Sequence, residues 1–197
     1  MVLKRFIAVK TVKQLKKIKK LPIVVVDIGF GQKSNKSCGV AAGKDFFVKL
    51  SFACAVCLVS KICAKYGKGV LLVLEAPLSG NFDESGNPIR RPFENNRSGW
   101  YHGAGAAVSM GALYFLERMT CKNSNIHLLE AFWTRGNNSI TQDDKVATWI
   151  HNEIRRSRRR RSEVFNSHGP ISKLVNGVPL VAIFKDNKLS SFQHHSR

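Results

Sequence analysis

The stretch that decides the fold is Leu-Pro-Ile-Val-Val-Val-Asp-Ile-Gly-Phe-Gly, residues 21–31. Its apolar run is short, rich in β-branched residues and bounded by Pro22 and glycine, which is typical of a strand buried on both faces. Such strands lie in the middle of sheets that helices cover. The run ends on Asp27, and a carboxylate there is costly to bury unless it is paired or holds a cation. Asp27 is therefore either a turn cap or a functional group.

The charge balance points to a polyanionic partner. The 197 residues, enough for one domain with one core, contain 32 Lys and Arg against 13 Asp and Glu, for a net charge of +19. This excess adds self-repulsion to the folded state, and it is explained by a partner of opposite charge. Nucleic acid is the first candidate, ahead of a membrane surface. A basic enzyme unrelated to nucleic acid is the alternative.

No segment of the sequence predicts a membrane protein or a secreted one. No apolar run approaches the roughly 20 residues that span a bilayer, and the N-terminus lacks the apolar stretch of a secretory signal. The five cysteines are an odd number, which favours a reducing, cytoplasmic compartment, with association to a nucleoid or nucleoprotein as a variant of it. Cys54 and Cys57 have CxxC spacing, but their apolar surroundings predict core packing.

The first twenty residues are interpreted as a basic N-terminal extension. Val12, Leu15 and Ile18 form a helical stripe surrounded by lysines, which predicts a short surface helix packed against the domain. The lysine face is either a solvated surface or a source of phosphate contacts. The main domain is expected over 21–185, followed by a tail at 186–197.

The rest of the chain predicts an α/β fold. Strands are expected at 38–42, 45–49, 70–75, 126–133 and 178–184, and helices at 50–66, 103–119 and from 141 through 154. The first three strands are joined by tight turns, which predicts an antiparallel meander. Residues 79–103 show no periodicity, and an inserted loop of this length is usually functional or disordered.

Acidic residues stand at corresponding places in these elements. The apolar strand at 70–75 ends on Glu75, as the first strand ends on Asp27. The last predicted helix opens with Asp143 and Asp144, and Glu130 lies within the strand at 126–133. Carboxylates brought together from adjacent strand ends and a facing helix repel one another strongly. Hard divalent cations such as Mg²⁺ or Mn²⁺ relieve that repulsion and prefer oxygen ligands.

Three segments carry a resemblance to a known family: Val-Val-Val-Asp-Ile-Gly-Phe-Gly at 24–31, Leu-Val-Leu-Glu-Ala-Pro-Leu-Ser at 72–79, and Asp-Asp-Lys-Val-Ala at 143–147. Their order resembles the ribonuclease H-like superfamily, in particular its RuvC-like branch and related predicted nucleases. The resemblance covers residues 21–155. It implies a mixed five-stranded sheet, with a three-strand antiparallel meander and parallel strands, flanked by helices.

The resemblance also implies a catalytic site. Asp27, Glu75 and Asp144 would hold Mg²⁺ or Mn²⁺, with Asp143 as a further catalytic carboxylate. Thr141 stands where the family pattern has an aspartate, so the fourth carboxylate is lost or is replaced by Asp143 or Glu130. Two metal ions in such a site activate a water and stabilise the leaving oxygen during phosphodiester cleavage.

Two segments are candidates for nucleic-acid contacts. In the loop at 79–103, arginines would bind phosphates, and two aromatic residues either stack on an unpaired base or anchor the loop. These residues are Arg90, Arg91, Arg97, Trp100 and Tyr101. The second segment is the arginine run at 155–161, which goes beyond the capping of a helix C-terminus. It contains Arg155, Arg156, Arg158, Arg159, Arg160 and Arg161.

The function expected from the sequence is a metal-dependent nuclease that acts on DNA or RNA. The alternative is a non-catalytic nucleic-acid-binding subunit of a larger nucleoprotein complex with the same fold and an incomplete metal site. Actin-like and sugar-kinase-like ATPases also have a first strand that ends Asp-x-Gly, but they contain two copies of the fold, and this chain holds only one.

Overall fold

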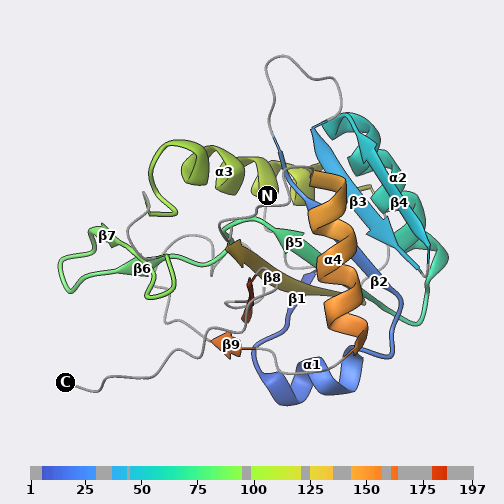
Figure 1. The fold of residues 1–197 in the computed structure, drawn as a ribbon, viewed down its shortest axis with the longest axis horizontal. Coiled ribbons are helices and arrows are strands. Elements are labelled where there is room, and N and C mark those ends of the chain that lie inside the picture. The colour runs from blue at the N-terminus through green and yellow to red at the C-terminus, as the bar shows by residue number, and fades with distance from the viewer. Residues whose placement is uncertain are drawn as a thin grey trace.

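The computed structural model describes residues 6–29, 37–43, 45–94, 99–120, 125–134, 143–156, 161–163 and 179–185. Figure 1 shows their arrangement. The strands are β1 (Phe6–Ala8), β2 (Ile23–Asp27), β3 (Cys38–Ala42), β4 (Phe46–Leu50), β5 (Val70–Glu75), β6 (Asn81–Phe82), β7 (Pro88–Ile89), β8 (Ile126–Thr134), β9 (Arg161–Glu163) and β10 (Val181–Lys185). The helices are α1 (Val12–Ile18), α2 (Phe52–Lys65), α3 (Gly103–Arg118) and α4 (Asp143–Arg156).

The main sheet confirms the predicted α/β class with mixed strand directions. Its order is β4-β3-β2-β5-β8-β10-β9, and β1 also pairs with β8. Strands β2, β3 and β4 form the antiparallel meander, and β5, β8 and β10 continue the sheet in parallel with β2. With eight strands in the described residues, the sheet is larger than the expected five, because β1, β9 and β10 extend it past β8.

The N-terminal segment packs on the domain through α1, as predicted, and it also adds strand β1 to the main sheet, so the domain includes residues before 21. Strand β1 pairs with the first half of β8, and β10 pairs with the second half on the same side. Phe6 and Leu15 are buried in the core. A capping box between Thr11 and Gln14 starts α1. The alternation of apolar and exposed residues in β1 spans only three positions, which is too short to predict a strand from periodicity alone.

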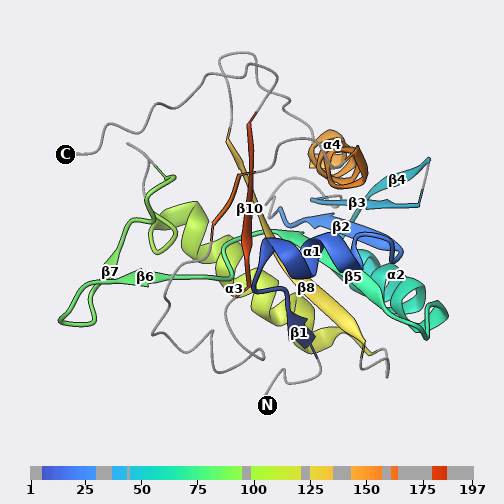
Figure 2. The same ribbon diagram turned by 90° about the horizontal axis from the view of Figure 1, so that it is seen from below.

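Helices cover both faces of the sheet. In Figure 2, α4 lies on one side of β2 and β3, and α2 lies on the other. Val25, Ala41 and Ile150 belong to the hydrophobic cluster under α4, to which α1 also contributes Leu15. Val24 and Val26 point to the opposite cluster, which α2 and α3 cover. Successive residues of β2 therefore pack against different helices, as expected for a central strand.

The segment at 79–103 has more structure than the sequence predicted. Strands β6 and β7 form a small hairpin that projects from the domain in Figures 1 and 2. Asp83 accepts a hydrogen bond from the backbone N–H of Asn87 at 2.8 Å, and Gly86 between them has φ +83°. Each strand has two residues, so no apolar periodicity could indicate the hairpin. It is formed by turn chemistry instead.

The cysteines differ from the prediction of core packing. Cys54 and Cys57 are exposed on α2, whereas Cys38 and Cys63 are buried. The reason is helix geometry, since the side of α2 that contacts the sheet carries Ala55, Val59 and Cys63. Across the described part of the chain, no helix is both long and apolar enough to traverse a membrane.

Candidate functional site

The two carboxylates predicted at strand ends lie side by side. Asp27 and Glu75 are the last residues of β2 and β5, and they are direct partners in the parallel pairing of these strands. Both lie on the α4 face, because Val25 and Val73, two positions earlier, belong to the cluster under that helix. Asp27 is 8% exposed, and Glu75 is half-buried. The end of the central strands thus brings two acidic groups together at the edge of the core.

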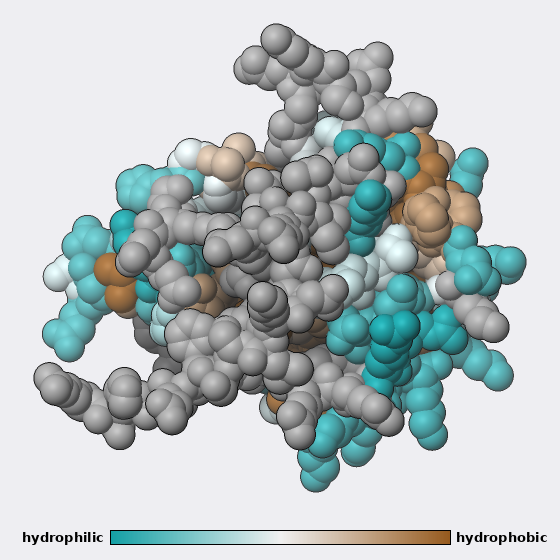
Figure 3. Space-filling model, viewed as in Figure 1, coloured by the Kyte–Doolittle hydropathy of each residue, from teal (hydrophilic) through white to brown (hydrophobic). Residues whose placement is uncertain are grey.

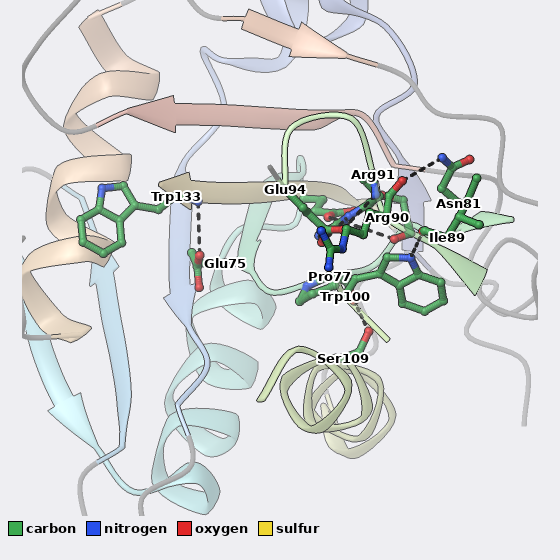
Figure 4. A network of polar contacts seen from close by, with 12 residues as sticks. Glu75, Pro77, Asn81, Ile89, Arg90, Arg91, Glu94, Trp100, Ser109 and Trp133 are labelled. Atoms are coloured by element: carbon green, nitrogen blue, oxygen red, sulfur yellow. Dashed lines mark hydrogen bonds and ion pairs between the residues drawn. The ribbon is translucent and has the colours of Figure 1, made fainter. Parts of the chain in front are cut away.

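Contacts from two other elements hold the segment that carries Glu75. The backbone N–H of Trp133 on β8 donates to Glu75 Oε1 at 3.3 Å, as Figure 4 shows. Two residues past Glu75, the carbonyl oxygen of Pro77 accepts a hydrogen bond from Ser109 Oγ of α3 at 2.6 Å. The carboxylate and the chain that follows it are therefore held by a strand of the same sheet and by a helix that covers one of its faces.

Helix α4 approaches this pair with its N-terminal end. At its C-terminal end, Arg155 Nη1 lies 3.5 Å from the carbonyl oxygen of Gly43. Gly43 directly follows Ala42, which pairs with Val24 near the beginning of β2. The helix begins at Asp143, so its first turn lies toward the opposite end of β2, where Asp27 is. The side chains of Asp143 and Asp144, like Thr141, lie outside the described residues.

The donor atoms suit a hard cation. Asp27 and Glu75 offer carboxylate oxygens, the ligands that Mg²⁺ and Mn²⁺ prefer. Among the described side chains, no group of three or more His, Cys, Asp or Glu residues is close enough to hold a metal ion. A third protein ligand would therefore come from a side chain outside those described. The resemblance gives this role to Asp144.

Glu130 lies on the other face of the sheet and forms a buried ionic network. Its carboxylate pairs with the Arg91 guanidinium and accepts a hydrogen bond from Ser79 Oγ at 2.6 Å. Arg91 also binds Glu94, with Nη2 2.7 Å from Oε1. Its Cζ lies 4.7 Å from the centroid of the Phe93 ring. The network attaches the insert at 79–94 to the middle of β8, and Figure 4 shows Arg91 and Glu94 on the side of the hairpin, away from α4.

These contacts revise two expectations from the sequence. Arg91 is 1% exposed and cannot reach a phosphate, because its guanidinium is enclosed between two carboxylates. Glu130 is 0% exposed and faces away from Asp27 and Glu75, so it does not replace the missing carboxylate. Burial raises the pKa of the Glu130 carboxyl, and the charge of Arg91 and the Ser79 hydroxyl oppose that change.

The aromatic residues of the insert anchor the hairpin. Trp100 Nε1 donates to the carbonyl oxygen of Ile89 at 3.1 Å, and its ring packs edge-on against Phe82 at 5.5 Å. Tyr101 packs against Trp100 in turn, with 5.7 Å between the centroids. Both are half-buried, and Arg90 beside them is exposed. These contacts account for the anchoring role, and stacking on a base stays a prediction. Arg97 lies outside the described residues.

The arginine run is described only at its ends. Arg155 and Arg156 are exposed in the last turn of α4. Arg161 begins β9, and its side chain is not among those described. Arg158, Arg159 and Arg160 lie outside the described residues. Phosphate binding by Arg155 and Arg156 stays a prediction.

Sequence reasoning missed the residues that hold the Glu75 segment and the insert in place. Ser79, Glu94, Ser109 and Trp133 contact partners up to 58 positions away along the chain. Only the three-residue spacing of Arg91 and Glu94 gave a local hint, since such pairs often interact. Comparison of the chain with models of protein families, with curated proteins and with solved structures finds no match.

Proposed function

We propose that this protein is a divalent-metal-dependent nuclease with a ribonuclease H-like fold of the RuvC-like type. The observation that carries the proposal is the pairing of Asp27 with Glu75 at the ends of adjacent parallel strands, in a sheet whose last long helix begins near them. The strand order β4-β3-β2-β5-β8 supports it. It combines the antiparallel meander with the parallel strands that the resemblance implies.

The chain's own residues have distinct tasks in this proposal. Asp27 and Glu75 hold Mg²⁺ or Mn²⁺, together with Asp144, and Asp143 assists. Trp133 and Ser109 keep the Glu75 segment in place, so that the carboxylates are positioned before metal arrives. When bound, the metal supplies activation of a water and stabilisation of the leaving oxygen.

The net charge of +19 supports nucleic acid as the substrate. Lysine and arginine side chains neutralise phosphates regardless of sequence, and such binding weakens as salt rises. Exposed Arg90, Arg155 and Arg156 are candidates for these contacts. The charge favours DNA and RNA equally.

The test is cleavage of labelled single-stranded and structured DNA and RNA with Mg²⁺ or Mn²⁺. Asp27→Asn is expected to abolish cleavage while sparing binding, because it removes a metal ligand and leaves the basic surface intact. Asp45→Asn is the matched control, since Asp45 is an exposed residue in the turn before β4. Full activity of Asp27→Asn, or of the wild type in excess chelator, contradicts the proposal.

One observation favours a second candidate, a non-catalytic nucleic-acid-binding subunit. Only two of the described carboxylates meet at the strand ends, and Thr141 stands where the family pattern has an aspartate. Salt-dependent binding without cleavage in Mg²⁺ or Mn²⁺ of any of these substrates would select this candidate.

A further inference from the structure

Helix α1 and the residues on either side of it carry a cluster of lysines. Between Phe6 and Val26 the chain has six lysines and no acidic residue. Five of them are exposed, namely Lys10, Lys13, Lys16, Lys17 and Lys20. Lys13 and Lys17 stand two positions to either side of Leu15, which is buried. On a helix these positions lie opposite the buried residue, so the ammonium groups of α1 face solvent.

This helix lies beside the C-terminal end of α4. Leu15 and Ile18 of α1 belong to the same hydrophobic cluster as Ile154 in the last turns of α4. Arg155 and Arg156 follow at once and are exposed. Figure 1 shows α1 next to this end of α4, and in Figure 3 hydrophilic residues gather over the same region. The two helices together present one basic surface.

The basic surface is at the opposite end of α4 from the carboxylates. The helix has 14 residues, which corresponds to a length of about 20 Å. Its first turn lies toward Asp27, and its last turn lies beside α1. Each strand of a B-form duplex has one phosphate per 3.4 Å of helix axis, so the separation equals about six nucleotides of a strand in this geometry.

We propose that α1 and the last turn of α4 form a second binding surface for the phosphate backbone, about six nucleotides from the scissile bond. The inference takes its substrate, nucleic acid, from the proposed function. It adds how much of the strand the protein contacts. Charge complementarity identifies the occupant, because the cations of this surface outnumber its acidic charge, Glu153, which lies 4.0 Å from Arg156, and such a surface matches a polyanion.

A membrane surface fits α1 less well. Helices that lie on bilayers insert a free apolar face between the lipids. Most of the apolar face of α1 is occupied, because Leu15 is buried and Ile18 packs against the core, and Val12, which is 41% exposed, is the one apolar side chain of this helix left for a bilayer. A second copy of the chain would bring two basic surfaces together, which like-charge repulsion opposes.

The experiment compares two triple variants that remove the same charge. Lys13→Gln, Lys16→Gln and Lys17→Gln change α1. Lys61→Gln, Lys65→Gln and Lys68→Gln change exposed lysines in and just after α2, on the other face of the sheet. Binding to labelled oligonucleotides of about 6 and about 24 nucleotides is measured in chelator at several salt concentrations. A third variant, with arginine at the three α1 positions, keeps the charge.

On the long strand, the α1 variant is expected to reduce the steepness of log affinity against log salt by about 2. Each phosphate contact contributes about 0.7 to this slope on a single strand, and three lysines are changed. The α2 variant and the arginine variant are expected to match the wild type. The short strand is repelled by the metal-free carboxylates in chelator and binds at the basic surface, so the α1 variant is expected to lose affinity for it as well. Equal slopes for the α1 and α2 variants on the long strand would overturn the inference. A loss on anionic phosphatidylserine vesicles that exceeds the loss on nucleic acid would do the same.

This outcome is separate from that of the proposed function. If the α1 variant binds weakly and cleavage persists in chelator, the metal-dependent mechanism fails and the binding surface stands. If Asp27→Asn abolishes cleavage and both triple variants bind alike, the mechanism stands and the binding surface fails.

Discussion

Acidic residues have different surroundings on the two faces of the sheet. On the face of α2 and α3, Glu130 is enclosed with Arg91, so the protein supplies the counter-charge from its own insert. On the face of α4, Asp27 and Glu75 stand next to each other, two like charges at the end of adjacent strands. An enclosed ion pair fixes one segment of chain to another, whereas adjacent carboxylates can share a cation. The same residue type therefore has a structural role on one face and a candidate catalytic role on the other.

The sharpest test of this difference is a pair of matched substitutions. Glu75→Gln is expected to lower the cleavage rate about a thousandfold, or about 4 kcal/mol, because it removes a metal ligand. Glu130→Gln is expected to leave the metal dependence of cleavage unchanged and to lower the free energy of unfolding. Single-turnover cleavage and urea unfolding of both variants provide the check. Loss of activity in a stably folded Glu130→Gln protein would show that the two faces are not separate in function.

Breaking the ionic network is expected to cost stability. Arg91→Met leaves Glu94 and Glu130 without their buried cation, and such losses amount to about 3–5 kcal/mol. Adding Glu94→Gln and Glu130→Gln is expected to restore much of this, since the uncompensated charges are then gone. The free energy of unfolding in urea is the measurement. Arg90→Met is the control next in sequence, exposed and expected to change stability little. A large loss in that control would contradict the assignment.

Ser109 lies on α3, on one face of the sheet, and donates a hydrogen bond to the carbonyl oxygen of Pro77. Pro77 is two residues past Glu75, whose side chain lies on the other face. Ser109→Ala is expected to lower the free energy of unfolding by about 1 kcal/mol, the usual contribution of one hydrogen bond. If the contact also positions Glu75, the concentration of Mg²⁺ or Mn²⁺ needed for half-maximal cleavage rises. An unchanged metal requirement would show that Trp133 alone is sufficient to orient the carboxylate.

The smallest expected effect concerns His151, which is buried on α4. Burial lowers the pKa of this histidine below its ordinary value of 6.5, and the charge of Arg155 adds to the shift, while a hydrogen bond with Asn152 opposes it. The unfolded chain then binds the proton more readily than the folded one. The stabilisation from the neutral ring is complete above pH 6.5 and is lost as the pH falls through the lowered pKa.

Thermal unfolding between neutral and mildly acidic pH tests this expectation. His151→Gln is expected to flatten part of the pH dependence, and the remainder belongs in part to His127, whose pKa burial also lowers. His102→Gln is the control, because His102 is exposed at the start of α3. An unaltered pH profile in His151→Gln would show that the charge on this ring is not what destabilises α4 in acid.

Local patterns in the sequence determined most of the secondary structure and the two strand-end carboxylates. Strands β3 and β5 were predicted with the bounds that they have, and β2 and α3 nearly so, because continuous apolar runs and helical periodicity are local signals. The same logic identified Asp27 and Glu75, whose positions follow from where the apolar runs stop. The apolar stripe of α1 likewise indicated a helix packed on the domain, whereas strand β1, the hairpin and the exposure of Cys54 and Cys57 were beyond such signals.

Only the tertiary structure decided which polar groups meet. Arg91 and Glu130 are 39 positions apart, and nothing in the sequence near either residue indicates that they pair. The face on which Glu130 lies depends on the register of β8, since a shift of one residue would move it to the side of Asp27 and Glu75. The sequence alone therefore placed acidic residues at the ends of strands. The packing of helices on both faces determined that one of them is neutralised by an arginine and that two others lie together.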